Sequence, residues 1–150
     1  VMHVITLDLH ARLQAALPSV TVLLPDEQQL PLQAAPVDAQ GRPAVGTGER
    51  GLGTYLATRP EGYVQIETPE PITTTGNQDT YWTAVAAIAG TAEQAAALDT
   101  QIRTALAGTP PADPGWYKLV IPSRHAPIAP GVHLARATYA RTLLLGQMPN

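Results

Sequence analysis

The sequence predicts an α+β fold, a mostly antiparallel sheet with two helices packed on one face, in a single domain spanning residues 1–150. Apolar residues recur at helical spacing in two separate segments. Runs of β-branched and aliphatic residues, bounded by proline and glycine, lie between and after them. The predicted order is therefore helix, strand, long arm, strand, strand, helix, strand, strand, with antiparallel hairpins joining most consecutive strands.

The chain opens with an amphipathic helix predicted over residues 6–17. Thr6 is its expected N-cap, and Pro18 ends the pattern. Its apolar stripe comprises Ile5, Leu9, Leu13, Ala16 and Leu17. A short aliphatic run at residues 20–24, closed by Pro25, predicts a strand with one buried face.

Residues 25–60 differ in character and predict a projecting arm or long loop. The segment is rich in Gln, Ala and Gly, and its prolines are Pro25, Pro31, Pro36, Pro43 and Pro60. Proline fixes an extended backbone and removes amide donors, so we expect the arm to become ordered mainly against neighbouring subunits. The side chains expected to find contacts there are Leu30, Leu32, Val37, Tyr55 and Leu56. A short edge strand is predicted at residues 52–57.

Two strands should follow the arm. Residues 63–67 alternate with the two-residue period of a strand, which Pro69 and Pro71 end, and residues 73–79 predict a polar turn. The next strand, residues 80–89, should present Trp82, Ala84, Ala86 and Ile88 on one face, and Tyr81, Thr83, Val85 and Ala87 on the other. Both faces are thus partly apolar, which indicates either a central strand of one core or a strand at a subunit interface.

The second helix has the clearest signals in the sequence. Thr91 and Gln94 have capping-box spacing, and Gly108 supplies a C-terminal stop. Its apolar stripe comprises Ala95, Leu98, Ile102, Ala105 and Leu106.

After this helix the chain returns to strands. A strand is predicted at residues 116–121, then a loop at residues 122–131, and a closing strand at residues 132–145.

Composition excludes several classes of function. With 45% hydrophobic and 14% charged residues, the chain should fold, and its formal net charge of -3 argues against a strongly basic nucleic-acid binder. The absence of cysteine excludes disulfides, thiolate metal sites and cysteine nucleophiles. Charged residues within residues 1–17 indicate neither a signal peptide nor an anchor, and no membrane association is expected.

The sequence contains strings that resemble catalytic or binding motifs, but the residues around them do not fit those motifs. Residues 46–51 match G-x-G-x-x-G as a string, but no strand precedes them and no helix follows, so they predict a loop. The histidines, His3, His10, His125 and His133, lack metal-ligand spacing.

Serine and carboxylate chemistry is no better supported. Ser19 and Ser123 lack the surroundings of a nucleophile elbow. Glu67 and Glu70 flank a proline-rich turn and are expected to be solvated. The sequence does not show which of the scattered Asp and Glu side chains lie close together in the fold, so acid-base catalysis by a pair of carboxylates stays open at this point. We therefore predict no catalytic, cofactor-binding or metal-binding residue, no cofactor, and a protein that is not an enzyme.

Several segments, taken in order, resemble one protein family. An amphipathic helix and a strand (residues 9–24) are followed by Arg-Pro-Glu-Gly-Tyr-Val-Gln-Ile at residues 59–66. A polar turn then leads into an aromatic-containing strand at residues 76–85, and a helix begins at Thr91. Two closing strands complete a layout that is similar to the tail-terminator, or tail-completion, proteins of the head-to-tail neck of long-tailed phages.

This resemblance implies a structural virion protein, assembled in the host cytoplasm. It implies a hexameric ring that caps the tail tube, stops its polymerisation and joins the tail to the head. The partners would be other copies of the chain, the tail tube protein and a head-closure or connector protein, and DNA would pass through the lumen without specific binding. The alternatives are another head-to-tail joining protein (a head-closure or adaptor subunit), and a small ligand-binding domain or enzyme with a pocket formed by the arm.

Overall fold

The computed structural model describes residues 4–28, 56, 59, 61–76, 78–107, 117–129 and 131–144. The elements, in chain order, are α1 (Val4–Ala16), β1 (Thr21–Leu23), the short 3-10 helix η1 (Pro25–Glu27), β2 (Tyr63–Ile66), β3 (Glu70–Thr75), β4 (Gln78–Ala89), α4 (Ala92–Ala107), β5 (Lys118–Ala129) and β6 (Val132–Leu144).

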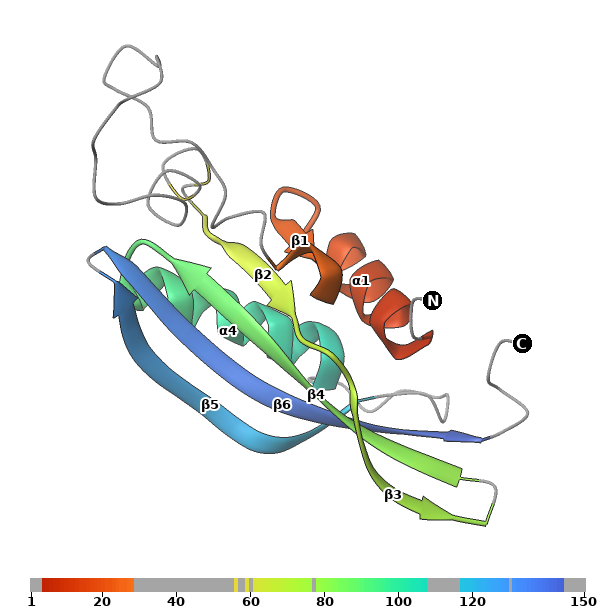
Figure 1. The fold of residues 1–150 in the computed structure, drawn as a ribbon. Helices are drawn as coiled ribbons and strands as arrows, with labels where there is room; N and C mark the ends of the chain where they lie inside the picture. Colours follow the sequence, from red (N-terminus) through yellow and green to blue (C-terminus); the bar gives the residue numbers. More distant parts are fainter. Residues whose placement is uncertain are drawn as a thin grey trace.

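The strands form one six-stranded sheet with the order β1-β2-β4-β6-β5. β1 pairs with β2 in parallel, and all other pairs are antiparallel. β3 pairs with the first part of β4, whereas β2 pairs with its last part, so both lie along the same edge of β4. Figure 1 shows the β3–β4 hairpin extending away from the two helices. The α+β fold and the predicted element order are confirmed, and the structure adds one strand, β3, between β2 and β4.

Both helices pack on the same face of the sheet, and the main core lies between the helices and that face. α1 contacts β1 and β2, whereas α4 lies over β4, β5 and β6 (Figure 1). The helices bury most of the apolar stripes that the sequence predicts against one face of the strands, but Ala16 is exposed and Ala105 is half-buried. The strand residues in this core include Val22, Val64, Ile66, Val85, Ala87, Ala135, Ala137 and Tyr139.

A second, smaller cluster lies on the opposite face of the sheet. It comprises Leu23, Leu56, Tyr63, Ala86, Ile88 and Val132. The last part of β4 is therefore buried on both faces within the chain itself. The alternation predicted for this strand is confirmed, and its position at the centre of the sheet accounts for the two apolar faces.

The helix ends test the predicted caps. At α4, the backbone N–H of Gln94 donates to Thr91 Oγ1 at 3.1 Å, which confirms Thr91 as the N-cap. At α1, the predicted cap is wrong, because the helix begins by Val4 and Thr6 lies buried within it. The predicted stop at Gly108 lies outside the described residues.

β3 corrects the prediction that a strand ends at the prolines and a polar turn covers residues 73–79. Pro71 lies within β3, and the register shifts next to it. β3 pairs on only one side, so a residue without an N–H is tolerated there. The turn itself is shorter than predicted, and it includes Gly76 at a φ of 58°.

β5 corrects a second prediction, because residues 122–129 continue the strand instead of forming a loop. β5 pairs with β6 from Lys118 to Ala129. Pro122 and Pro127 are accommodated because β5 is the edge strand and its register shifts three times. The closing strand β6 lies where it was predicted.

Most of the predicted arm, including the predicted loop at residues 46–51, lies outside the described residues. Leu56 is described, and it corrects two predictions. Its backbone is helical and not part of a strand, and its side chain is only 8% exposed within the second cluster of its own chain. Arg59 follows it and donates from Nε to Thr21 Oγ1 at 3.2 Å. This end of the arm therefore packs on the body of the domain.

Candidate interaction surface

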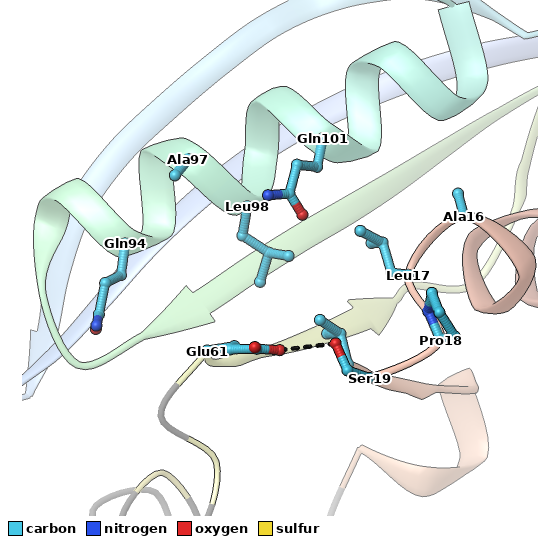
Figure 2. A pocket seen from close by; sticks show the side chains of 10 residues that line it. Ala16, Leu17, Pro18, Ser19, Glu61, Gln94, Ala97, Leu98 and Gln101 are labelled. Carbon is cyan, nitrogen blue, oxygen red and sulfur yellow. Dashed lines mark hydrogen bonds between the residues drawn. The ribbon is translucent and has the colours of Figure 1, made fainter.

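An open groove separates the end of α1 from α4. Figure 2 shows its lining, in which the buried Leu17 and Leu98 face each other across the floor. Its volume is about 390 Å³. Ala97 and Pro18 form exposed apolar walls. The groove thus offers a concave apolar surface of a size that binds side chains or small molecules.

The sequence fixes one wall of this groove through the turn after α1. Pro18 cannot continue the helix, and the backbone N–H of Val20 donates to the carbonyl of Leu17 at 3.1 Å. The amide of Gln14 donates to the same carbonyl at 3.2 Å and to the carbonyl of Val20 at 3.1 Å. These bonds satisfy backbone carbonyls of the turn itself, so the turn holds a defined shape.

The groove continues along α4. A neighbouring hollow of about 310 Å³ shares Ala16, Leu17 and Gln101 with it and is also lined by Thr104 and Ala105. Among the described residues that line the two hollows, Glu61 is the one charged group, and it accepts a hydrogen bond from Ser19 at 3.0 Å. We call this surface the interhelical groove.

A polar cluster ties α1 to the other end of the chain. Oδ2 of Asp8 accepts hydrogen bonds from Nε of Arg12 at 2.8 Å, from the hydroxyl of Tyr117 at 2.8 Å, and from Arg141. The guanidinium groups of Arg12 and Arg141 lie 5.6 and 5.2 Å from the centre of the Tyr117 ring. Burial raises the pKa of Tyr117, so the phenol stays neutral. Because one carboxylate oxygen serves three donors, the cluster is a structural tie between α1, β5 and β6.

A second polar cluster lies beneath α4. Asp99 is buried, and its carboxylate accepts a hydrogen bond from Ser123 on β5. Tyr139 lies nearby, and burial, reinforced by the charge of Asp99, raises its pKa. The hydroxyl of Tyr139 and Oδ1 of Asp99 make no hydrogen bond within the described residues. Ser123 therefore anchors a helix to an edge strand, a role that its position in a predicted loop did not suggest.

The remaining residues singled out in the sequence do not come together. His10 lies on α1, His125 on β5 and His133 on β6, and His3 lies outside the described residues. Within the part of the chain that the structure describes, no three His, Cys, Asp or Glu side chains lie close enough to hold a metal ion.

Glu67 differs from the expectation that it is merely solvated. It accepts two hydrogen bonds from Arg136, at 2.6 and 2.9 Å, across β4 on the face without helices. This ion pair borders a shallow hollow of about 170 Å³ that Glu70 and Trp82 also line. The hydrogen bonds that Arg136 donates to Glu67 raise the pKa of Arg136, so the guanidinium stays charged.

Sequence reasoning missed the groove residues Gln94, Ala97 and Gln101. Their spacing of three, four and seven residues places them on one side of a helix, beside the buried stripe that includes Leu98. This spacing was visible in the sequence, but the opposing wall, formed by residues 16–20, was not.

Two comparisons of the sequence with known proteins found no match. No protein-family model matches the chain, and no curated protein sequence matches it. Among the helices that the structure describes, none is long and apolar enough to cross a membrane.

Proposed function

We propose that this chain is a structural subunit of the phage neck, a tail terminator that forms a ring at the end of the tail tube. In this role the ring stops polymerisation of the tube and joins the tail to the head. The proposal starts from the order of sequence segments that resembles the tail-terminator family, and an α+β domain with this element order is compatible with it.

The observation that carries the proposal is the interhelical groove. Outside the groove, the surface of α1 adds exposed apolar side chains: Leu7 is 50% exposed, and Ala11 and Ala15 are also exposed. Depletion of charge and exposure of apolar side chains are typical of the centre of a protein–protein interface. This surface therefore supports a function based on assembly with other proteins.

The sheet edges favour contacts through faces and not through strand addition. β1 has only three residues, β3 contains Pro71, and β5 contains Pro122 and Pro127. Short strands, prolines and bulges reduce pairing between sheet edges. Ring neighbours would then meet through the helical layer.

The doubly apolar strand, in contrast, gives no support for a subunit contact. Ala86 and Ile88 are buried against their own chain, so β4 needs no second subunit to cover them. Two exposed isoleucines, Ile72 at 42% and Ile128 at 45%, are better candidates for contacts with the tail tube or the head connector.

Charge is consistent with a ring around DNA. The net charge of -3 disfavours tight binding of phosphates, so DNA would pass without being held. A head-closure or adaptor protein shares these properties, and the partner that the ring binds distinguishes the two roles.

Electron microscopy of the purified chain tests the proposal. We expect rings with a central opening wide enough for duplex DNA, and binding of these rings to one end of a tail tube. Particles without a central opening at every concentration tried would contradict it.

A further inference from the structure

We propose that the interhelical groove binds residues 29–37 of a second copy of this chain. This inference rests on the proposed function, because it assigns the contact that links neighbouring subunits of the ring. The occupant is identified by its chemistry and by the positions at which residues 29–55 leave and rejoin the described fold.

The groove calls for a neutral, apolar segment. Its floor is formed by Leu17 and Leu98, and the small side chain of Ala97 leaves the wall open. Among the described residues of the lining, the charged one is Glu61, which accepts a hydrogen bond from Ser19. An acidic segment would lose its hydration here and would also be repelled by the carboxylate of Glu61.

Two glutamines on α4 are placed to bind a backbone. Gln94 and Gln101 are seven residues apart, which corresponds to about 10.5 Å along a helix. Figure 2 shows both amides beside the groove. In a polyproline II segment, which has no internal hydrogen bonds, three residues span about 9.3 Å, so two carbonyls of such a segment match the two amides.

The sequence of residues 28–37 has the required chemistry. It reads Gln-Gln-Leu-Pro-Leu-Gln-Ala-Ala-Pro-Val and contains no charged residue. Leu30 and Leu32 flank Pro31, which fixes φ near the polyproline II value and lacks an N–H donor. A proline-containing segment loses less conformational entropy on docking than other segments do, which favours this mode of recognition.

The two ends of the segment favour docking on a neighbour over docking on the same chain. At its start, the carbonyl of Leu24 accepts a hydrogen bond from Gln65, whose side chain lies on the face without helices. At its end, Leu56 packs on that same face. The groove opens on the helical face, so docking within one chain would require residues 29–55 to round the β1 edge twice. A neighbour whose groove adjoins the β1 edge would receive the segment directly after Gln28, and residues 38–55, which span up to about 60 Å, would return the chain to Leu56.

The first experiment measures binding of a fluorescein-labelled peptide of residues 28–38 by anisotropy. The receptor is the full chain with Leu30→Asp and Leu32→Asp, so that its own segment does not compete. We expect saturable binding, which Ala97→Glu in the receptor weakens at least about tenfold because it places a charge in the groove. The matched control is Ala92→Glu, also exposed on α4 but outside the groove, and it should bind as before. Equal binding to both receptors would overturn the proposal.

The second experiment mixes two full-length variants. Ala97→Glu has a blocked groove and an intact segment, whereas Leu30→Asp/Leu32→Asp has the reverse. Each alone should be monomeric, and together they should form a one-to-one dimer by sedimentation. Monomers in the mixture would overturn docking on a neighbour. If Ala97→Glu forms rings, the groove proposal is wrong but the proposed ring function stands. If the peptide binds and the mixed variants dimerise, but the wild-type chain forms no ring, only the proposed ring function is wrong.

Discussion

Tyr117, which immediately precedes β5, donates a hydrogen bond of 2.8 Å to Asp8 on α1, 109 positions earlier in the chain. The bond joins the first helix to the start of β5, the strand at the opposite edge of the sheet from β1. Arg12 and Arg141 lie near the tyrosine ring. α1 is therefore held by a polar tie as well as by its apolar stripe.

This tie predicts a graded loss of stability. Tyr117→Phe removes the hydroxyl but leaves two arginine donors to Asp8, so we expect a loss of about 1–2 kcal/mol in the free energy of unfolding. Tyr117→Leu also removes the ring that the guanidinium groups contact, and it should cost more. Chemical denaturation measures both. A Tyr117→Phe protein as stable as wild type would show that the hydroxyl contributes nothing.

Two glycines with positive φ provide a matched pair. Gly62 has a φ of 86°, and a Cβ there would clash with the carbonyl of Ile88 and lie 2.9 Å from Cβ of Ala89. Gly76 has a φ of 58°, and a Cβ there meets no described atom within 4 Å. Gly76→Ala should cost about 1–2 kcal/mol for the left-handed backbone alone. Gly62→Ala should cost about 1–3 kcal/mol more because of the clash. Equal melting temperatures would contradict the close approach at Gly62.

Neighbouring residues on α4 test its orientation. Leu98 is 3% exposed, and Leu98→Glu would bury an unpaired carboxylate at a cost of several kcal/mol, comparable to the stability of a domain. Ala97 is exposed, so Ala97→Glu should change the free energy of unfolding by no more than about 0.5 kcal/mol. Thermal melting followed by circular dichroism compares the stability of the two variants. A folded Leu98→Glu protein would mean that this face of α4 is not in the core.

The buried tyrosines predict instability at alkaline pH. Burial raises the pKa of Tyr117 and of Tyr139 above the ordinary value of about 10. The folded state therefore keeps protons that the unfolded state loses above that pH. The contribution to stability is fully present below about pH 10 and falls as the pH rises further.

Tyr139→Phe isolates part of this effect. The Tyr139 hydroxyl has no hydrogen-bond partner in the described residues, so the variant should be about as stable as wild type at pH 8. Above about pH 10 it should lose stability less steeply. Urea unfolding at a series of pH values measures both slopes. Parallel curves would show that Tyr139 does not resist ionisation.

The sequence predicted the fold where local signals and tertiary contacts agree. The cap at Thr91 and the stripe around Leu98 depend on residues within one helix, and the structure has both. β3 was missed because Pro71 usually ends a strand, and only its pairing with one side of β4 makes proline acceptable there.

The interaction surface was less accessible to prediction. The two leucines of its floor, Leu17 and Leu98, are more than eighty positions apart in the chain, and no periodicity within α4 reveals what lies opposite. Leu56 shows the same limit, since its burial depends on a sheet face formed by distant strands.

Native mass spectrometry of the wild-type chain at micromolar concentration tests the central claim most directly. We expect a closed hexamer of the wild-type chain. The Ala97→Glu variant, which carries a charge in the interhelical groove, should not form it. A wild-type chain that stays strictly monomeric, both alone and with tail tubes, would contradict the claim that this protein functions as a ring.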